Sequence, residues 1–491
     1  MNQKEMFPAQ AEQTAPSPVR RGPPNRMNDL DYSTWMKFQK SFFWYESSQM
    51  LVDDCVYFFT KSVWPDGIPS RSLIIGVKDY TSKIPAPRQI EIRPAEDITQ
   101  VIDGLLQAVE NSLCYDFIIV DLRHCITTPD ELRVFLAEYA DKLFQAIRQL
   151  LHPDRFCGVL VGTGNRGGSG FPIPWSIGMS GRQYLKLKDE KVGLAESSEK
   201  VFYCLFMQAQ ADEVSSKPIN PDNIRWAVAD FHIPAWILPK SPPRKKNEIL
   251  HPAKYPETLV MPFIELFTKP GQTVFDPMVG TGSTVIAAIR CDRNGYGVDL
   301  MQDFVDIAKE RIVGEKQPML LAEFESKAEG VILCGDSAHL DENSELAGKE
   351  FHYAITSPPY WSMLNNPGSE NQEARRQKQL QLVYSDSDGD LGNVTDYHVF
   401  LTLLKNVYHQ VANKLVAGAC LTVVVKNVKR EHSIYTLAWD IVEHLCNNDG
   451  RYEYLGTTLW CQDDISLKPF AVGTHWVSNT LHNYCLHFRK R

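Results

Sequence analysis

The sequence predicts an α/β protein whose C-terminal half forms a doubly wound, Rossmann-like sheet, with an additional α/β domain before it. Three observations carry this prediction: one apolar run ends in a glycine turn, a second ends in an acid, and a third ends in a double proline. Apolar runs that alternate with stretches of helical spacing are typical of βαβ units. Such sheets bind their ligands at the carboxyl ends of the strands.

The first run leads into a turn that can approach a ligand closely. Residues 272–276 have the composition of a strand, Gly280 and Gly282 permit a tight turn, and residues 283–284 can begin a helix. The free N–H groups at a helix start favour a ligand there. Val285 replaces the third glycine of the dinucleotide fingerprint, so we expect a nucleoside ligand without a pyrophosphate.

The second run, residues 295–298, ends in Asp299, which lies 17 residues beyond Gly282 (299 − 282). In dinucleotide-binding folds an acid about 20 residues after the glycines binds ribose hydroxyls. The spacing therefore predicts that Asp299 contacts the sugar of the nucleoside.

The third run, residues 353–355, is followed by Ser357-Pro358-Pro359-Tyr360 and then Trp361. Two prolines fix their φ angles and donate no hydrogen bond, so the loop is rigid and offers free carbonyl groups beside an aromatic ring. Such a loop suits a planar group that carries an amine. Taken alone, it is also consistent with a plain connection between two elements.

These motifs, in this order, resemble those of the amino-methyltransferases of DNA, which use S-adenosylmethionine to methylate the exocyclic amine of cytosine or adenine. The resemblance extends over residues 251–360, where residues 251–259 look like the segment that packs on the methionine and residues 331–337 like the strand that contacts the adenine. It implies S-adenosylmethionine as cofactor, double-stranded DNA with a flipped base as partner, and no metal. The catalytic residues that it implies are Ser357, Pro358, Pro359 and Tyr360. The cofactor-binding residues that it implies are His251, Pro252, Lys254, Pro256, Asp276, Pro277, Gly280, Thr281, Gly282, Ser283, Thr284, Asp299, Asp336 and Ser337.

The resemblance also implies a division of labour within the catalytic loop. We expect Ser357 and the carbonyl before Pro359 to accept the hydrogens of the amine, and Tyr360 to stack on the base with Trp361 as a second wall. Serine at the first position favours the N4 amine of cytosine. Three alternatives stay open: adenine N6, an RNA substrate, and a non-catalytic regulatory protein on the same scaffold.

Length and composition predict several parts for a chain of 491 residues. Residues 1–29 read as a disordered tail, 30–238 as the N-terminal α/β domain, 239–250 as a basic linker, and 251–491 as the catalytic domain with an insert at 365–392. No run is apolar and long enough to span a membrane, and the eleven cysteines include no Cys-x-x-Cys pair. These features favour the reducing cytoplasm.

The net charge of −9 requires any DNA contact to lie on a local basic stripe. The family leaves open a restriction or defence-system partner. Asp386, Asp388 and Asp390 lack the downstream glutamate of a calcium loop and are expected in solvent. The residues expected to contact nucleic acid are Trp361, Arg375, Arg376 and Lys378 after the catalytic loop and Arg244, Lys245 and Lys246 in the linker.

The two halves of the chain share a faint repeat. At a constant offset of 265 (400 − 135), Phe135, Gln145 and Leu150 match Phe400, Gln410 and Leu415, and later residues 203–205 and 484–486 both read Tyr-Cys-Leu. A duplication would place the strand at 117–120 where residues 353–355 lie, followed by Asp121-Leu122-Arg123-His124 without a proline pair. The first copy is then expected to be a scaffold or DNA clamp, with Asp121 and His124 as an acid–base pair the weaker alternative.

Overall fold

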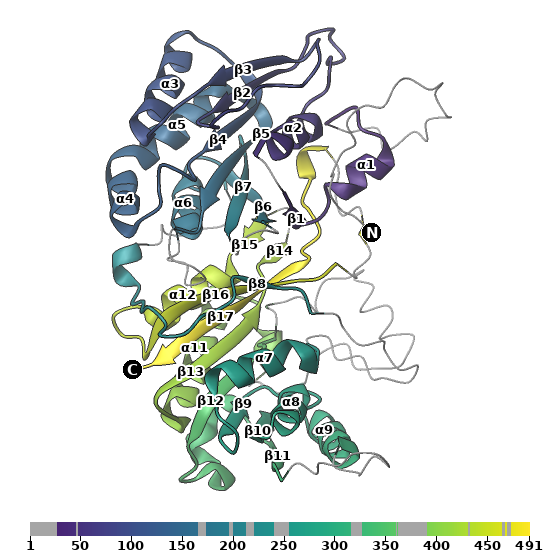
Figure 1. Ribbon diagram of the computed structural model, residues 1–491, viewed down its shortest axis with the longest axis vertical. Coiled ribbons are helices and arrows are strands. Elements are labelled where there is room, and N and C mark those ends of the chain that lie inside the picture. The colour runs from purple at the N-terminus through teal and green to yellow at the C-terminus, as the bar shows by residue number, and fades with distance from the viewer. Residues whose placement is uncertain are drawn as a thin grey trace.

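The computed structural model contains two α/β units, one from each half of the chain (Figure 1). It describes residues 27–45, 48–164, 173–195, 200–212, 220–239, 255–315, 327–359, 361, 390–430, 433–463, 467–468 and 473–491. The N-terminal unit occupies the upper part of Figure 1 and the C-terminal unit the lower part. This architecture confirms the predicted α/β class.

The N-terminal unit is built on a seven-stranded sheet with the order β1-β6-β7-β5-β4-β2-β3. Strand β4 is buried along its whole length, in agreement with the apolar run at residues 117–120. The elements are α1 (Tyr32–Lys37), β1 (Phe42–Trp44), α2 (Ser48–Phe59), β2 (Arg71–Ile75), β3 (Gln89–Arg93), α3 (Ile98–Glu110), β4 (Tyr115–Asp121), α4 (Pro129–Val134), the π-helix η1 (Phe135–Tyr139), α5 (Ala140–Leu150), β5 (Leu151–Gly162), α6 (Ile173–Gly181), β6 (Lys186–Leu194), β7 (Val201–Gln208) and η2 (Pro221–Asn223).

The C-terminal unit is built on an eight-stranded sheet with the order β11-β10-β9-β12-β13-β17-β16-β8. Its elements are β8 (Trp236–Ile237), α7 (Glu257–Phe267), β9 (Thr273–Asp276), α8 (Ser283–Arg290), β10 (Asn294–Asp299), α9 (Gln302–Glu315), β11 (Gly330–Cys334), η3 (Ser337–Glu342), η4 (Ser344–Leu346), β12 (Phe351–Thr356), η6 (Leu391–Asn393), α11 (Tyr397–Lys414), β13 (Leu415–Val425), α12 (Leu437–Cys446), β16 (Tyr452–Cys461), η7 (Gly473–His475) and β17 (His482–Lys490). A separate hairpin, β14 (Val428–Arg430) and β15 (Ser433–Tyr435), follows β13.

The order of the strands places the site. From β9 the chain continues outward through β10 and β11, whereas from β12 it continues to β13 on the other side. β9 and β12 pair in parallel, so their carboxyl ends meet at the point where the strand order reverses. In doubly wound sheets this reversal opens the crevice that binds the ligand.

The helices cover the sheets with the apolar faces that their sequences predict. In α11, the buried side chains at Phe400, Leu404, Val407 and Val411 recur every three or four residues. The side chain of Asp396 caps this helix by accepting the N–H of Val399 at 2.8 Å.

The two units share one continuous apolar cluster, although their sheets are separate. Helices α6 and α12 meet between them, where Trp175 and Trp439 stack with their ring centroids 5.8 Å apart. Segments from each predicted domain also cross to the other unit: β8 pairs with β16 of the C-terminal sheet, and Trp476 packs in the core of the N-terminal unit. Sequence composition could not reveal these exchanges, because they depend on long-range packing.

The described chain begins earlier than the predicted end of the tail at residue 29. Met27 is buried, and the side-chain amide of Asn28 donates to the carbonyl of Phe58 at 2.6 Å. Among the described residues no helix is long and apolar enough to cross a membrane. All eleven cysteines are free.

Candidate functional site

The glycine turn after β9 has the geometry that its sequence predicts. Gly280 and Gly282 both have positive φ, at 52° and 88°, in the region where a side chain is strained. A Cβ atom at Gly282 would lie 3.0 Å from the Cβ of Ala308 in α9. The second glycine therefore lets α8 begin close against the neighbouring helix.

The carboxylate of Asp276 braces this turn from inside the protein. It accepts hydrogen bonds from the hydroxyl of Tyr255 at 2.9 Å and from the N–H of Met278 at 3.1 Å, and also from the hydroxyl of Thr284. Burial raises the pKa of Asp276 above its ordinary value. Asp276 and Thr284 thus hold the shape of the turn, and the sequence did not single out Tyr255 as their partner.

A second brace was also missed by sequence reasoning. Glu257 at the start of α7 accepts a hydrogen bond from the hydroxyl of Ser283 at 3.0 Å and pairs with Arg311 of α9 at 2.5 Å. Arg311 also donates to the carbonyl of Thr281 in the turn. No local motif marks Arg311, because its partners lie on other elements.

Asp299 ends β10 beside the turn, as predicted. Its carboxylate accepts the N–H of Gly280 at 2.8 Å and the N–H of Met301 at 3.0 Å. Burial raises the pKa of Asp299 to about 6.

The catalytic motif follows β12. Ser357 and Pro359 lie at the carboxyl end of this strand, next to the turn that follows β9. The side chain of Ser357 is 7% exposed.

A cavity of about 370 Å³ joins these two motifs. It brings the expected ribose-binding acid, Asp299, and the expected catalytic serine, Ser357, to one space. Helix α11 contributes Leu403, Asn406 and Val407 to the lining. The cavity is lined by Pro277, Met278, Asp299, Leu300, Met301, Phe304, Asp336, Ser337, Ala338, His339, Ser357, Pro359, Asp390, Leu391, Val394, Leu403, Asn406 and Val407.

Of the described cofactor residues expected from the sequence, Pro277, Asp299, Asp336 and Ser337 line this cavity, and Pro256, Asp276 and residues 280–284 are not among its lining. Pro256 precedes α7 as its N-cap residue, and residues 280–284 form the glycine turn and the start of α8. Ser337 lines the cavity while its hydroxyl donates to the carbonyl of Pro277. Asp336 caps the following turn by accepting the N–H of Ala338 at 2.8 Å.

Asp390 corrects an expectation from the sequence. It was expected in solvent, yet its side chain is 6% exposed and lines the cavity. Its carboxylate accepts the N–H of Gly392 at 2.8 Å. The acidic run looked solvated because its composition carries no information about where its last residue packs.

Trp361 also differs from its expected role as a wall for the base. Its side chain is 4% exposed, and its indole N–H donates to the carbonyl of Thr395 at 3.2 Å. Its ring packs between Tyr397 and Tyr435, at centroid distances of 5.0 and 4.7 Å. Trp361 therefore anchors the catalytic loop to the protein instead of facing a ligand.

Several expected site residues lie outside the described part of the chain. They are Tyr360, His251, Pro252 and Lys254, the basic residues Arg244, Lys245, Lys246, Arg375, Arg376 and Lys378, and the acids Asp386 and Asp388. Among the residues that are described, no group of three or more side chains could hold a metal ion.

Comparison with known proteins identifies the part of this region that precedes residue 310. Residues 184–310 match the family model of a DNA methylase. Two relatives are the putative methylase YubD of Escherichia coli, 35% identical over 69 residues, and the type II methyltransferase M.Cfr9I of Citrobacter freundii, 40% identical over 65 residues.

These matches are short. They cover 14% of this chain and 30% of YubD, and 13% of this chain and 22% of M.Cfr9I. A solved structure described as a putative rRNA-methylase of Clostridium thermocellum covers 48% of this chain and 98% of its own, but with 12% identity and a TM-score of 0.30 it supports no argument. The family match falls on the glycine turn and Asp299, which the sequence motifs had singled out, and it agrees with S-adenosylmethionine as the cofactor. Over these short segments the chain is similar to DNA methylases, and it spans less than a third of the length of either relative.

Proposed function

We propose that this protein transfers a methyl group from S-adenosylmethionine to the exocyclic N4 amine of a cytosine in DNA. One observation carries the proposal: Asp299, Ser357 and Pro359 all line the same cavity. A nucleoside held by the acid would present its sulfonium methyl group towards the catalytic loop.

The residues of the cavity suit the two parts of such a cofactor. Asp299 can accept hydrogen bonds from the ribose hydroxyls, and the apolar walls from Phe304, Leu391 and Val394 suit a flat purine. Asp336 lies on the same wall, where it can accept a hydrogen bond from the amine of the adenine. The bound cofactor would supply the electrophilic methyl group.

The catalytic loop would then activate the amine. The lone pair of an exocyclic amine is delocalised into its ring, so the enzyme has to favour a pyramidal nitrogen. The hydroxyl of Ser357 and the carbonyl of Pro358 can accept the two N–H groups and hold the lone pair towards the methyl carbon. With its lone pair oriented by Ser357 and Pro358, the amine nitrogen would take the methyl group, release one proton to solvent and leave the cofactor as a neutral thioether.

The base has to leave the duplex to reach this loop, because its amine is inaccessible within a stacked helix. We assign cytosine because a serine leads the Pro-Pro-Tyr motif, as is commoner in the enzymes that act on cytosine. The basic residues 244–246 and 375–378 are proposed to contact the phosphates.

The product tests this proposal directly. DNA incubated with the protein and S-adenosylmethionine should yield N4-methylcytosine after digestion to nucleosides and mass spectrometry, and a parallel reaction without protein should not. N6-methyladenine would move the substrate to adenine, and a methylated base in RNA alone would move it to RNA. If S-adenosylmethionine binds but no base is methylated, the proposed activity is wrong and the regulatory alternative gains support.

The pKa of Asp299 predicts a pH dependence for cofactor binding. Because burial raises this pKa to about 6, the carboxylate is charged at pH 7 and above and becomes protonated as the pH falls. Ribose hydroxyls bind the charged form better, so affinity should be level between pH 7 and 8 and weaken by about tenfold for each unit below 6. Titration calorimetry from pH 5 to 8 measures this profile. A level profile in the wild type, or the same slope in Asp299→Asn, would contradict the assignment.

A further inference from the structure

The two sheets of the protein follow the same path. The seven-stranded sheet has the order β3-β2-β4-β5-β7-β6-β1. If the edge strand β11 is set aside, the eight-stranded sheet has the matching order β10-β9-β12-β13-β17-β16-β8. The directions agree as well: β5 and β13 both pair antiparallel with the next strand, and both edge strands, β1 and β8, are parallel to their neighbours. A shared topology alone could arise twice, so the register decides whether the halves are copies.

The register reproduces two irregularities at matching places. In the N-terminal sheet, Tyr115 pairs with Leu151 and Phe117 with Phe156; in the C-terminal sheet, Phe351 pairs with Leu415 and Tyr353 with Cys420. The partner strand advances five residues while the central strand advances two in both cases (156 − 151 and 420 − 415). Irregularities of this kind are conserved features of related sheets.

The second irregularity lies further along both sheets. Leu187 and Asp189 of β6 pair with the consecutive residues Met207 and Phe206, just as Tyr454 and Gly456 of β16 pair with Phe488 and His487. The same registers place the two Tyr-Cys-Leu segments at equivalent positions of the two sheets, since Val161 pairs with Tyr203 and Val425 with Tyr484.

The offset between the halves changes by one residue, and the structure shows where. Leu151 follows Phe135 by 16 residues (151 − 135), but its counterpart Leu415 follows Phe400 by 15 (415 − 400). The N-terminal copy contains the π-helix Phe135–Tyr139 in this interval. A π-helical turn accommodates one inserted residue. The expected matches of Gln145 with Gln410 and of Leu150 with Leu415 are therefore displaced by one position.

The N-terminal copy has no equivalent of the cofactor turn. Between β2 and β3 residues 76–88 contain no helix, whereas β9 and β10 are separated by the glycine turn and α8. Residues 76–88 therefore offer no helix N-terminus that could bind a cofactor at the carboxyl end of β2.

The position of the catalytic loop is filled in the N-terminal copy. Because Val120 pairs with Val159 as Thr356 pairs with Val423, Asp121 takes the place of Ser357. The guanidinium of Arg123 donates to both carboxylate oxygens of Asp121, at 2.9 and 2.6 Å, and lies 4.8 Å from the ring of Phe202. His124 contacts the carbonyl of Ala95 instead of Asp121, so these two residues do not form an acid–base pair.

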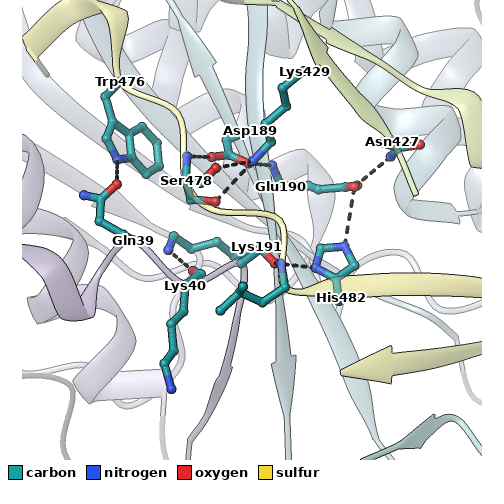
Figure 2. Close-up of polar contacts among 12 residues, drawn as sticks. Gln39, Lys40, Asp189, Glu190, Lys191, Asn427, Lys429, Trp476, Ser478 and His482 are labelled. Atoms are coloured by element: carbon teal, nitrogen blue, oxygen red, sulfur yellow. Dashed lines mark hydrogen bonds and ion pairs between the residues drawn. The ribbon is translucent and has the colours of Figure 1, made fainter. Parts of the chain in front are cut away.

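The N-terminal copy holds the hairpin β14–β15, which lies directly after β13 of the catalytic sheet. Asp189 forms an ion pair with Lys429 at 2.6 Å, and Glu190 accepts a hydrogen bond from the side chain of Asn427 at 2.7 Å (Figure 2). Arg182 donates to the carbonyl of Ile434 at 2.7 Å. Burial alone would raise the pKa of Asp189, but the ammonium groups of Lys429 and Lys191 hold it below its ordinary value.

The hairpin in turn holds the catalytic loop. Tyr435 packs on the ring of Trp361, and the guanidinium of Arg430 lies 5.1 Å from the centre of the same ring. Trp361 follows Ser357 by four residues (361 − 357). A continuous series of contacts therefore runs from Asp189 and Glu190 through the hairpin to the Ser-Pro-Pro loop.

We propose that the N-terminal half is a degenerate copy of the methyltransferase unit that binds no cofactor and, through Asp189, Glu190 and Arg182, positions the hairpin that supports the catalytic loop of the other half. One half of the chain thus supports the other half, as a partner subunit would in a dimer. The duplication stands independently of the proposed function, whereas the effect on catalysis rests on it.

Glu190→Leu tests the positioning role, with Glu190→Gln as the conservative variant and Gln208→Leu as the matched control. Gln208 is a buried polar residue of the adjacent strand β7 that donates to the carbonyl of Asp154, away from the hairpin. We expect Glu190→Leu to slow single-turnover methyl transfer by about ten- to a hundredfold with unchanged cofactor affinity, because small displacements at an active site have effects of this size. Glu190→Gln should retain most of the rate, and Gln208→Leu should leave it within about twofold.

Two further measurements make the outcome independent of activity. Hydrogen exchange should be faster for the amides of residues 428–435 in Glu190→Leu than in Gln208→Leu, and calorimetry should give one S-adenosylmethionine per wild-type chain.

If Glu190→Leu does not fold, Asn427→Ala removes the same hydrogen bond from the other side. Unchanged exchange and rate in both variants would overturn the positioning role, and two cofactors per chain would overturn the degenerate copy. A wild-type protein without methyl transfer would refute only the proposed function, because exchange and stoichiometry remain measurable.

Discussion

Ser357→Ala should reduce methyl transfer by about a hundredfold to a thousandfold while leaving the affinity for S-adenosylmethionine nearly unchanged. This is the range found when one group that stabilises developing charge is removed from an active site. Ser357 lines the cavity, and its hydroxyl can accept a hydrogen bond from the amine. Single-turnover kinetics with saturating cofactor and DNA measure the effect on the chemical step.

A binding measurement separates this effect from damage to the site. Calorimetry on Ser357→Ala should give the wild-type cofactor affinity, because the turn after β9 and Asp299 are untouched. A wild-type rate in the variant would show that the loop does not act through the serine. A loss of rate together with a loss of cofactor binding would show that Ser357 supports the cavity and not the amine.

Asp299→Ala should weaken the binding of S-adenosylmethionine by about ten- to a hundredfold or more. A hydrogen bond to a charged group contributes about 1.5–3 kcal/mol, and the two ribose hydroxyls can each donate one. The substitution also leaves the N–H groups of Gly280 and Met301 without their acceptor, which loosens the turn. Calorimetry at pH 7.5 measures the affinity.

Asp306→Ala is the control for this prediction. Asp306 is an exposed acid on α9, the helix that follows Asp299, and its carboxylate accepts from the side chain of Gln302. Asp306→Ala removes the same charge as Asp299→Ala, but Asp306 is not among the residues that line the cavity. Cofactor affinity should therefore stay within about twofold. Equal affinities for Asp299→Ala and Asp306→Ala, with both folds intact by circular dichroism, would remove Asp299 from the binding site.

As the proposed degenerate copy, the N-terminal half accounts for a second α/β unit beside the sheet that carries the cavity. Its strands keep the topology, the two register irregularities and the Tyr-Cys-Leu segments of the catalytic half. Its ligand positions have been replaced by the pair Asp121 and Arg123 and by a helix-free loop after β2. A duplicated unit that has lost its ligands can still present a surface, and here that surface supports the hairpin next to Trp361.

The local features of the site could be predicted from the sequence. The glycine turn, the acid at the end of β10 and the Ser-Pro-Pro loop after β12 could be read from residue type and spacing, because backbone freedom, helix starts and strand ends are set by neighbours in the chain. The α/β class and the similarity to DNA methylases follow from the same short segments. The two Tyr-Cys-Leu segments suggested the repeat that we propose here.

The contacts of each side chain, by contrast, follow only from the tertiary structure. Trp361 looked like a wall for a base and is buried against Tyr435, whereas Asp390 looked solvated and lines the cavity. Arg311 and Glu190 carry no motif, since their partners come from distant elements. Local sequence encodes conformational preference, but burial and pairing depend on which surfaces meet, and that is fixed by packing over the whole chain.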